Sequence, residues 1–266
     1  MARPKVFVVF YSTYGHVHTV AKSIQKGLEK VGNVDVELYQ FPETLSEDIL
    51  GKMHAPPKPD VPVITVDKLT EADGFLFGFP TRFGSAPAQV KSFFDATGGL
   101  WAKGALFGKP AGLFFSTASQ HGGQETTAMT FLPNLAHHGM IYVPAGFRNQ
   151  NLFDNSEVVG GSPWGAGTVA NGDGSRLPTE KELSIAETQG EEFAKFAAKF
   201  AAPLPKPTVA AAAEKAPATR APAAAAPTST AVATSARAAP SAGQNQDKTV
   251  TKKPSIFRRF LNKLKV

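Results

Sequence analysis

The sequence contains no cysteine among its 266 residues. This absence excludes disulfides, thiolate catalysis, cysteine-ligated metal sites and palmitoylation. No run approaches the roughly 18 apolar residues that a membrane-spanning helix needs. Residues 1–5 include no apolar stretch, and the second residue is Ala2 where myristoylation requires glycine. We therefore expect no signal peptide and no N-terminal lipid, and a soluble, intracellular protein.

Acidic residues are scarce in the last quarter of the chain. Residues 1–200 hold 17 Lys and Arg against 20 Asp and Glu, a net charge of −3. Residues 201–266 hold 11 basic residues against 2 acidic ones, a net charge of +9. The net charge of +6 therefore belongs to a basic tail on a nearly neutral body, and the two parts need separate explanations.

The body, residues 1–202, alternates strand and helix patterns. Apolar strands are predicted at 5–11, 34–40, 72–79, 111–117 and 140–144. Helices are predicted at 15–31, 88–96, 124–138 and 179–201. Apolar strands separated by helices indicate a parallel sheet covered on both faces. The prediction is an α/β fold, a doubly wound five-stranded parallel sheet of flavodoxin type, with its ligand beyond the carboxyl ends of the strands.

The turn after the first strand reads Ser-Thr-Tyr-Gly-His-Val at residues 12–17. Unpaired backbone N–H groups and the helix dipole make such a helix start an anion site, and Ser12, Thr13 and Thr19 add hydroxyl donors. The turn has neither the lysine of a GxxxxGK[ST] loop nor a GxGxxG spacing. What remains is a phosphate held by hydroxyls and amides, as suits flavin mononucleotide (FMN). The alternative is an ordinary N-capped helix.

Two further loops follow predicted strands, at 80–84 and 116–123, and both are rich in Ser, Thr and Gly. Loops at the carboxyl ends of parallel strands are where a ligand would lie. The segment 149–177 is too long for a simple connection. We expect it to cover the site or to build a subunit contact.

Six motifs then carry a family resemblance: YSTYGH at 11–16, PTRFG at 80–84, TGGLW at 97–101, LAHHGM at 135–140, GGSPWG at 160–165 and GDGSR at 172–176. With these motifs in order over residues 5–201, the chain resembles the WrbA family of flavodoxin-like NAD(P)H:quinone oxidoreductases. It looks like a fungal-type member with a C-terminal tail. The resemblance implies FMN as cofactor, NAD(P)H as electron donor, a quinone substrate and a homotetramer with active sites built across subunits.

The resemblance also implies site residues. It places the FMN phosphate on the turn of residues 12–17 and the flavin ring against the loops that begin at residues 80 and 116. The cofactor-binding residues are thus expected to be Ser12, Thr13, Tyr14, Gly15, His16, Val17, Pro80, Thr81, Arg82, Phe83, Gly84, Ser116, Thr117 and His137. Trp101 and His137 match the family's catalytic positions, a substrate-stacking tryptophan and a flavin-site histidine, and Tyr14 matches a nicotinamide-contacting tyrosine.

One loop departs from the family. After Ser116 and Thr117 the family often has a run of glycines, whereas this chain has Ala-Ser-Gln-His at 118–121. The loop is expected to be bulkier, which would alter its flavin contacts and narrow the quinone pocket.

Several residues have plainer interpretations. Trp101 could be a core anchor, although its glycine-rich surroundings are typical of a loop, and Arg82 could form only a salt bridge. Of the adjacent His137 and His138, one is expected to be structural, because neighbours on a helix point in different directions. No metal site is expected, since His16 and His18 have no carboxylate or cysteine companions nearby.

The tail divides in two. Residues 203–253 are mostly Ala, Pro, Ser and Thr, a composition that predicts a disordered linker. Residues 254–266 place Phe257, Phe260, Leu261 and Leu264 on one stripe of a short helix, and residues 248–266 contain seven basic residues and no acidic one. This pattern predicts binding of residues 252–266 to an anionic membrane surface. The alternatives are a partner groove or a solvated end; nucleic acid is not expected without a folded reading module.

The sequence therefore predicts an FMN-dependent enzyme that reduces quinones by two electrons, in the cytoplasm and peripheral to the plasma membrane. Sharing of one flavin face by donor and quinone would give ping-pong kinetics. The alternatives are a flavodoxin-like electron carrier, disfavoured by the weakly charged body and by Trp101, and a membrane-domain interaction protein with little turnover.

Overall fold

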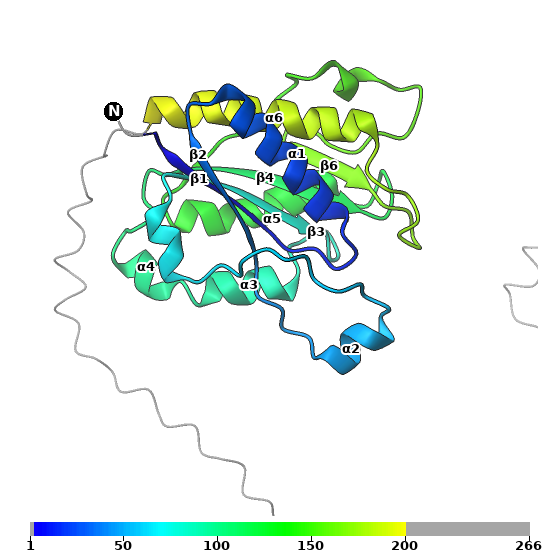
Figure 1. The fold of residues 1–266 in the computed structure, drawn as a ribbon, viewed down its shortest axis with the longest axis horizontal. Coiled ribbons are helices and arrows are strands. Elements are labelled where there is room, and N and C mark those ends of the chain that lie inside the picture. Colours follow the sequence, from blue (N-terminus) through cyan, green and yellow to red (C-terminus); the bar gives the residue numbers. More distant parts are fainter. Residues whose placement is uncertain (1–2, 201–266) are drawn as a thin grey trace, which may run out of the picture. The chain divides into compact units, whose positions relative to one another are not determined.

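The computed structural model describes residues 3–200, and the predicted linker and basic segment lie outside them. Strands and helices alternate along the chain (Figure 1). The strands are β1 (Lys5–Phe10), β2 (Asp35–Gln40), β3 (Gly74–Pro80), β4 (Pro110–Thr117), β5 (Ile141–Tyr142) and β6 (Gly165–Val169). The α-helices are α1 (His16–Val31), α2 (Glu47–Lys52), α3 (Ala88–Asp95), α4 (Gly98–Ala102), α5 (Gln124–His137) and α6 (Glu180–Phe200), with short 3₁₀ helices at Asp67–Glu71 and Gln150–Phe153.

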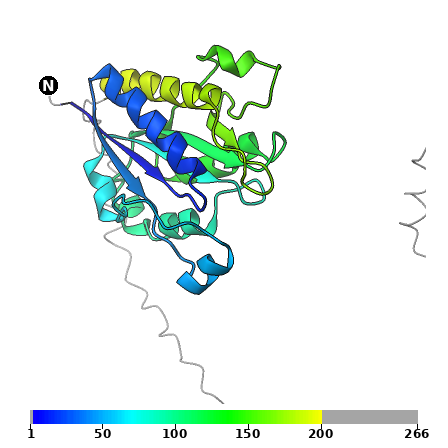
Figure 2. The ribbon, with the colours of Figure 1, turned by 45° about the vertical axis from the view of Figure 1, so that its right-hand side comes forward.

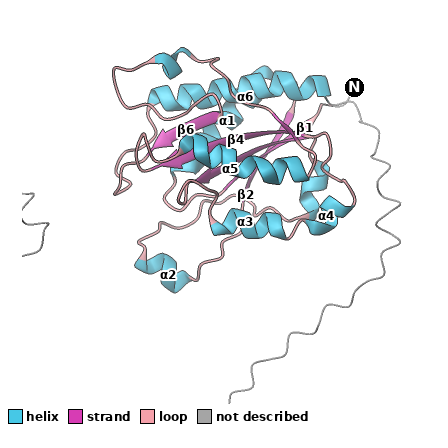
Figure 3. Ribbon diagram, turned by 180° about the vertical axis from the view of Figure 1, so that it is seen from behind, coloured by secondary structure: helices cyan, strands magenta, loops and turns pink. Residues whose placement is uncertain are grey.

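The sheet has the order β2-β1-β3-β4-β5, and every strand pair is parallel. This is the predicted doubly wound topology. Strands β3 and β4 are buried along their whole length, because helices cover both faces of the sheet. Figure 3 shows α3 and α5 on one face, whereas α1 and α6 lie on the other.

The fifth position of the sheet differs from the prediction. Only Ile141 and Tyr142 of the expected strand 140–144 pair with β4, and they reach no farther than Ala111. The rest of β4 pairs with β6, a strand inside the segment 149–177 that the sequence did not predict. Two of its five residues are glycines, and a Cβ on Gly165 would lie 2.1 Å from the Leu113 carbonyl oxygen. The close approach requires glycine, and glycine hides the strand pattern.

Two apolar layers hold the helices to the sheet. One, rich in phenylalanine, lies under α3 and α5 and includes Phe75, Phe77 and Phe131. The other, under α1 and α6, is mainly aliphatic and includes Val8, Ile24 and Leu28. Among the described residues, no helix is both long and apolar enough to cross a bilayer.

Helices α1 and α6 cross in close contact (Figures 1 and 2). A Cβ on Gly27 of α1 would lie 2.0 Å from the Glu187 carbonyl oxygen, and one on Gly190 of α6 would lie 2.2 Å from that of Ile24. Neither neighbour is a flexible side chain that could move aside. Glycine at both positions therefore lets the two backbones touch.

We predict that Gly190→Ala forces the two helices apart. The overpacking should lower the free energy of unfolding by about 1–3 kcal/mol, despite the better helix propensity of alanine. Urea unfolding measures the change. The matched control is Gly51→Ala in α2, where a Cβ would meet nothing within 4 Å, and it should be neutral or stabilise by up to about 1 kcal/mol. An unchanged midpoint for Gly190→Ala would contradict the close crossing.

Candidate functional site

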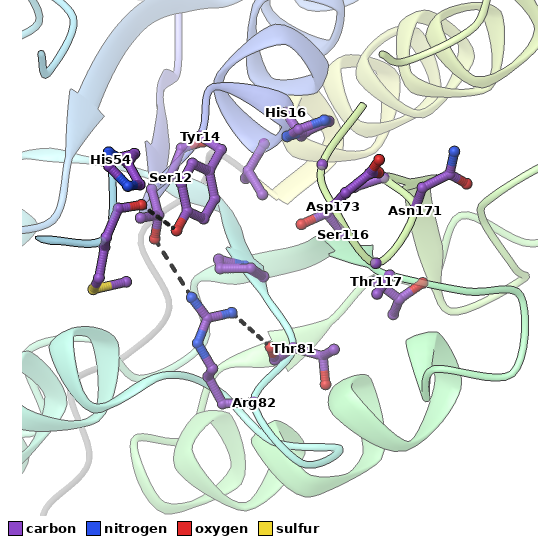
Figure 4. A pocket seen from close by; sticks show the side chains of 18 residues that line it. Ser12, Tyr14, His16, His54, Thr81, Arg82, Ser116, Thr117, Asn171 and Asp173 are labelled. Carbon is purple, nitrogen blue, oxygen red and sulfur yellow. Dashed lines mark hydrogen bonds between the residues drawn. The ribbon is translucent and has the colours of Figure 1, made fainter. Parts of the chain in front are cut away.

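A cavity of about 620 Å³ opens at the carboxyl ends of β1, β3, β4 and β6 (Figure 4). Its volume is within the range of small-molecule sites. Five segments of the chain line it: Ser12, Thr13, Tyr14, His16 and Val17; Met53 and His54; Pro80, Thr81 and Arg82; Ser116, Thr117 and Ala118; and Ala170, Asn171, Gly172, Asp173 and Gly174.

The turn at residues 12–17 exposes backbone donors to this cavity. Gly15 has φ +90°, a conformation that favours glycine, and its N–H donates to Ser12 Oγ at 3.0 Å. The first bond into the helix runs from Thr19 N to the Gly15 carbonyl. Within residues 3–200, the backbone N–H groups of Thr13, Tyr14, His16 and Val17 have no acceptor. The first turn of α1 carries no acidic residue, so these donors form an anion site.

His16 contributes an unpaired polar atom. Its side chain lines the cavity and is only 6% exposed, and no group within residues 3–200 bonds its buried Nε2. Buried polar atoms are nearly always paired, so a bound ligand or water is the natural partner for such an atom. Together with the amides and the buried hydroxyls of Ser12 and Thr13, this donor set fits the phosphate of FMN.

The second loop is fixed by the hydroxyl of Thr81. This oxygen accepts from Gly84 N at 3.1 Å and from Thr127 Oγ1 at 2.8 Å. Arg82 donates to the Thr81 carbonyl at 2.8 Å and to Thr13 Oγ1 at 3.4 Å, so a guanidinium lies beside the phosphate turn. A salt bridge, the plainer interpretation of Arg82, does not form with any carboxylate within residues 3–200.

Phe83 and Gly84 do not line the cavity, although the sequence predicted both as cofactor-binding residues. Phe83 has φ +52°, and this left-handed backbone turns its ring fully into solvent. Any contact of these two residues with the cofactor would be made by backbone atoms, and their role in cofactor binding stays a prediction.

The third loop follows β4. Ser116 and Thr117 are the last two residues of β4, and both are buried. Thr117 Oγ1 accepts a hydrogen bond from Gln124 Nε2 at 3.1 Å. Of the residues that depart from the family pattern, only Ala118 lines the cavity. Gln120 and His121 instead line a separate hollow beside α5. The larger side chains of this loop thus lie outside the cavity.

The residues 170–174 complete the cavity and were missed as site residues. Part of the segment 149–177 therefore covers the site, as expected. The loop is held by Glu182, which is fully buried and accepts from Val169 N at 3.1 Å, Thr168 Oγ1 at 2.9 Å and Arg176 Nη1 at 2.9 Å. The motif GDGSR at 172–176 was the available signal, since glycine flanking an aspartate is typical of a turn.

Met53 and His54 were also missed. They lie in the long connection after β2, and the Tyr14 hydroxyl donates to the Met53 carbonyl at 3.0 Å. His54 has φ +53°. No local pattern marks these residues, because their place at the cavity depends on how the whole connection folds back.

Trp101 and His137 lie away from the cavity. Trp101 belongs to helix α4, which corrects its expected loop setting, and α4 precedes the start of β4 (Figure 1). His137 ends α5 just before β5. Both side chains are exposed, Trp101 at 58%, at the amino ends of the strands. Thus a single chain does not bring the two predicted catalytic residues to the other predicted site residues.

His138 is the structural member of the histidine pair. It is buried, and its Nε2 lies 2.7 Å from Thr97 Oγ1. Burial, and to a lesser extent the neighbouring His137, lowers the pKa of His138, so its ring is neutral at pH 7.

Comparison with known proteins identifies the family of this chain. The family model described as NADPH-dependent FMN reductase matches residues 4–152. Quinone-oxidoreductase QR2 of Triphysaria versicolor is 60% identical over 197 residues, which cover 74% of this chain and 96% of that protein. NAD(P)H quinone oxidoreductase YCP4 of Candida albicans is 57% identical over 199 residues, covering 74% of this chain and 69% of that protein.

A similar fold occurs in a solved structure, the flavodoxin WrbA-like protein from Agrobacterium tumefaciens. Its TM-score is 0.51 at 23% identity, and the match covers 74% of this chain and 98% of that one. The family model spans more than half of the chain, and the relatives share more than half of the aligned residues. The chain therefore belongs to the WrbA-like family of flavodoxin-like NAD(P)H:quinone oxidoreductases.

Proposed function

We propose that the protein catalyses the FMN-dependent, two-electron reduction of quinones by NAD(P)H, with donor and quinone using one flavin face in turn. The observation that carries this proposal is the open-amide turn at residues 12–17 facing a hydroxyl-lined cavity at the switch point of the sheet. The names of the relatives, quinone oxidoreductases in two genera, support the reaction class.

In this proposal the chain's own residues bind the cofactor and orient the substrates. The amides of Thr13, Tyr14, His16 and Val17 hold the phosphate, and Arg82 stabilises negative charge beside it. The redox chemistry, hydride transfer from the nicotinamide and two-electron reduction of the quinone, would be supplied by FMN held at these residues. Tyr14, half-exposed at the rim, offers an aromatic face to planar substrates. Because nicotinamide and quinone are both planar and would occupy the same space, they bind one after the other.

We predict ping-pong kinetics. The rate of NAD(P)H oxidation by FMN-loaded protein, measured at several fixed benzoquinone concentrations, should give parallel lines in a double-reciprocal plot. A ping-pong sequence has no step in which both substrates are bound. The apparent kcat/KM for NAD(P)H is therefore independent of the benzoquinone concentration. Intersecting lines would contradict the shared face. Bound FMN with negligible turnover would favour the electron carrier or the interaction protein.

Trp101 and His137 are proposed to act on the cavity of a neighbouring subunit in a homotetramer. Three features support this: both side chains are exposed, neither lines the cavity of its own chain, and Phe107 beside them is also 48% exposed. The adjacent Gly139 keeps the Phe107 ring close, since a Cβ there would lie 2.4 Å from it. A second copy would bury these rings and roof the flavin.

We predict complementation between two impaired variants. Trp101→Ala removes the ring and should lower kcat/KM about tenfold, the scale of one lost aromatic stack. Gly15→Val, at φ +90°, distorts the phosphate turn and should prevent FMN binding. Mixed tetramers should regain activity, because the intact cavity of one chain meets the intact tryptophan of the other. Light scattering reports the assembly, and mixtures no more active than their parts would contradict the shared site.

Residues 252–266, outside the described part of the chain, are proposed to bind anionic membrane and place the enzyme at the plasma membrane. Six of the fifteen residues, Ile256 among them, are apolar, and six are basic. Each basic residue near an anionic surface contributes about 1 kcal/mol.

We predict that the full chain sediments with vesicles rich in phosphatidylserine and that a chain ending at Ala202 does not. Neutral phosphatidylcholine vesicles serve as the control, and changing the six basic residues to Gln should abolish sedimentation by removing the electrostatic attraction. Equal sedimentation of full and shortened chains would contradict the membrane role.

A further inference from the structure

The connection from residue 42 to residue 62, called here the strap, leaves the edge strand β2 and folds back to the cavity. It contains α2 and presents Met53 and His54 to the cavity. Two charged residues near its ends, Glu43 and Lys58, meet beside the phosphate turn. The strap and the turn therefore join at one polar cluster.

Lys58 is at the centre of this cluster. Its Nζ lies 2.8 Å from Glu43 Oε2 and 4.6 Å from the centre of the Tyr11 ring, and it donates to the Ser12 carbonyl oxygen at 3.1 Å. Its side chain is 28% exposed, so the ammonium is partly shielded from water. Tyr11 and Ser12 are the residues that lead from β1 into the phosphate turn.

Glu43 fixes the lysine from the other side. Its carboxylate accepts from Tyr11 Oη at 2.9 Å, from Gln89 Nε2 at 3.0 Å and from Thr44 N at 2.9 Å. Burial opposes its ionisation, but hydrogen bonds from Lys58, from the Leu45 and Thr44 backbone and from Gln89 lower the pKa of Glu43 to about 2. The carboxylate is therefore ionised at neutral pH and keeps Lys58 in place.

The bond to Ser12 has a geometric consequence for the turn. In a planar trans peptide the carbonyl oxygen and the following N–H point in opposite directions. With the Ser12 carbonyl directed at Lys58, the Thr13 N–H is directed to the opposite side of the peptide, and it has no acceptor within residues 3–200. An amide held in this way is ready for an anion and loses little entropy on binding.

We propose that Lys58 is a positioning residue of the phosphate site: it holds the Ser12–Thr13 peptide so that the Thr13 N–H faces the FMN phosphate. The turn itself contains no lysine, and the strap supplies one from more than forty residues away in the sequence. Because Glu43 neutralises the lysine, its contribution is orientation and not long-range attraction. The inference rests on the FMN site of the proposed function.

The test compares FMN with riboflavin, which has the same ring system and no phosphate. Dissociation constants of both flavins are measured by fluorescence quenching on the full chain, for wild type and Lys58→Met. The methionine keeps an unbranched apolar stem and removes the donor. Lys52→Met is the matched control, since Lys52 is a 73% exposed strap lysine that pairs, within residues 3–200, only with Asp48.

Lys58→Met should weaken FMN binding about tenfold, as expected for one lost charge-assisted hydrogen bond, and leave riboflavin binding unchanged. Lys52→Met should change neither. An equal loss for both flavins would overturn the proposal, because it would mean that Lys58 only holds the strap over the cavity. Unchanged FMN binding would overturn it as well.

Two further measurements keep the outcomes distinct. If Lys58→Met fails to fold, Glu43→Gln takes its place under the same criterion, because it releases the lysine from the other side. Wild-type preference for FMN over riboflavin tests the phosphate site itself. Equal wild-type affinity for the two flavins would contradict that site, and with it the role of Lys58.

Discussion

The parallel direction of β1, β3, β4 and β6 determines where this protein can bind a ligand. Parallel strands end at the same edge of a sheet, so the loops that follow them meet there. The register places Phe10 beside Gly78, Pro80 beside Ser116 and Thr117 beside Val169. Residues from four distant parts of the sequence are thereby brought to one level, and the cavity lies between them.

Buried polar side chains hold the less regular half of this edge. Gln124 donates to Thr117 Oγ1 and to the Thr168 carbonyl, both at 3.1 Å, and accepts from Gly161 N. Glu182 accepts from backbone and side-chain donors around β6 and forms an ion pair with Arg176. Removing one partner of such a buried pair typically costs about 3–5 kcal/mol. Within residues 3–200, β6 pairs with only one strand, β4, and these side chains bond backbone groups on and around it. They thereby fix the 170–174 wall of the cavity.

The two ends of the sheet have different chemistry. At the carboxyl ends, open amides, hydroxyls and Arg82 provide for an anionic cofactor. At the amino ends, Trp101, Phe107 and His137 are exposed to solvent. Exposed aromatic rings cost solvation free energy and are typical of surfaces that meet a partner. The phosphate turn and the cavity beside it are thus built within one chain, whereas the proposed substrate roof depends on two.

The sequence by itself determined the alternation of strands and helices, the doubly wound parallel class of the sheet and the phosphate turn. Each depends on short-range signals: continuous apolar runs, a glycine after Ser-Thr, and the start of an amphipathic helix. It also placed Thr81, Arg82, Ser116 and Thr117 at the site, because they lie at the carboxyl end of a strand or just after it. The family resemblance supplied FMN and the quinone, which no local pattern specifies.

Only the tertiary structure decided the rest. Strand β6 was hidden because Gly165 and Gly167 remove the β-branched pattern while allowing the backbone to approach Leu113 and Gln124. His54 and the 170–174 loop reach the cavity, and Lys58 reaches the Ser12 carbonyl oxygen, through connections whose paths depend on packing against the whole sheet. Trp101 and His137 looked like neighbours of the flavin, yet chain direction puts them at the opposite edge. Sequence periodicity reports which face of an element is buried, but which elements meet is decided by long-range contacts that no local window contains.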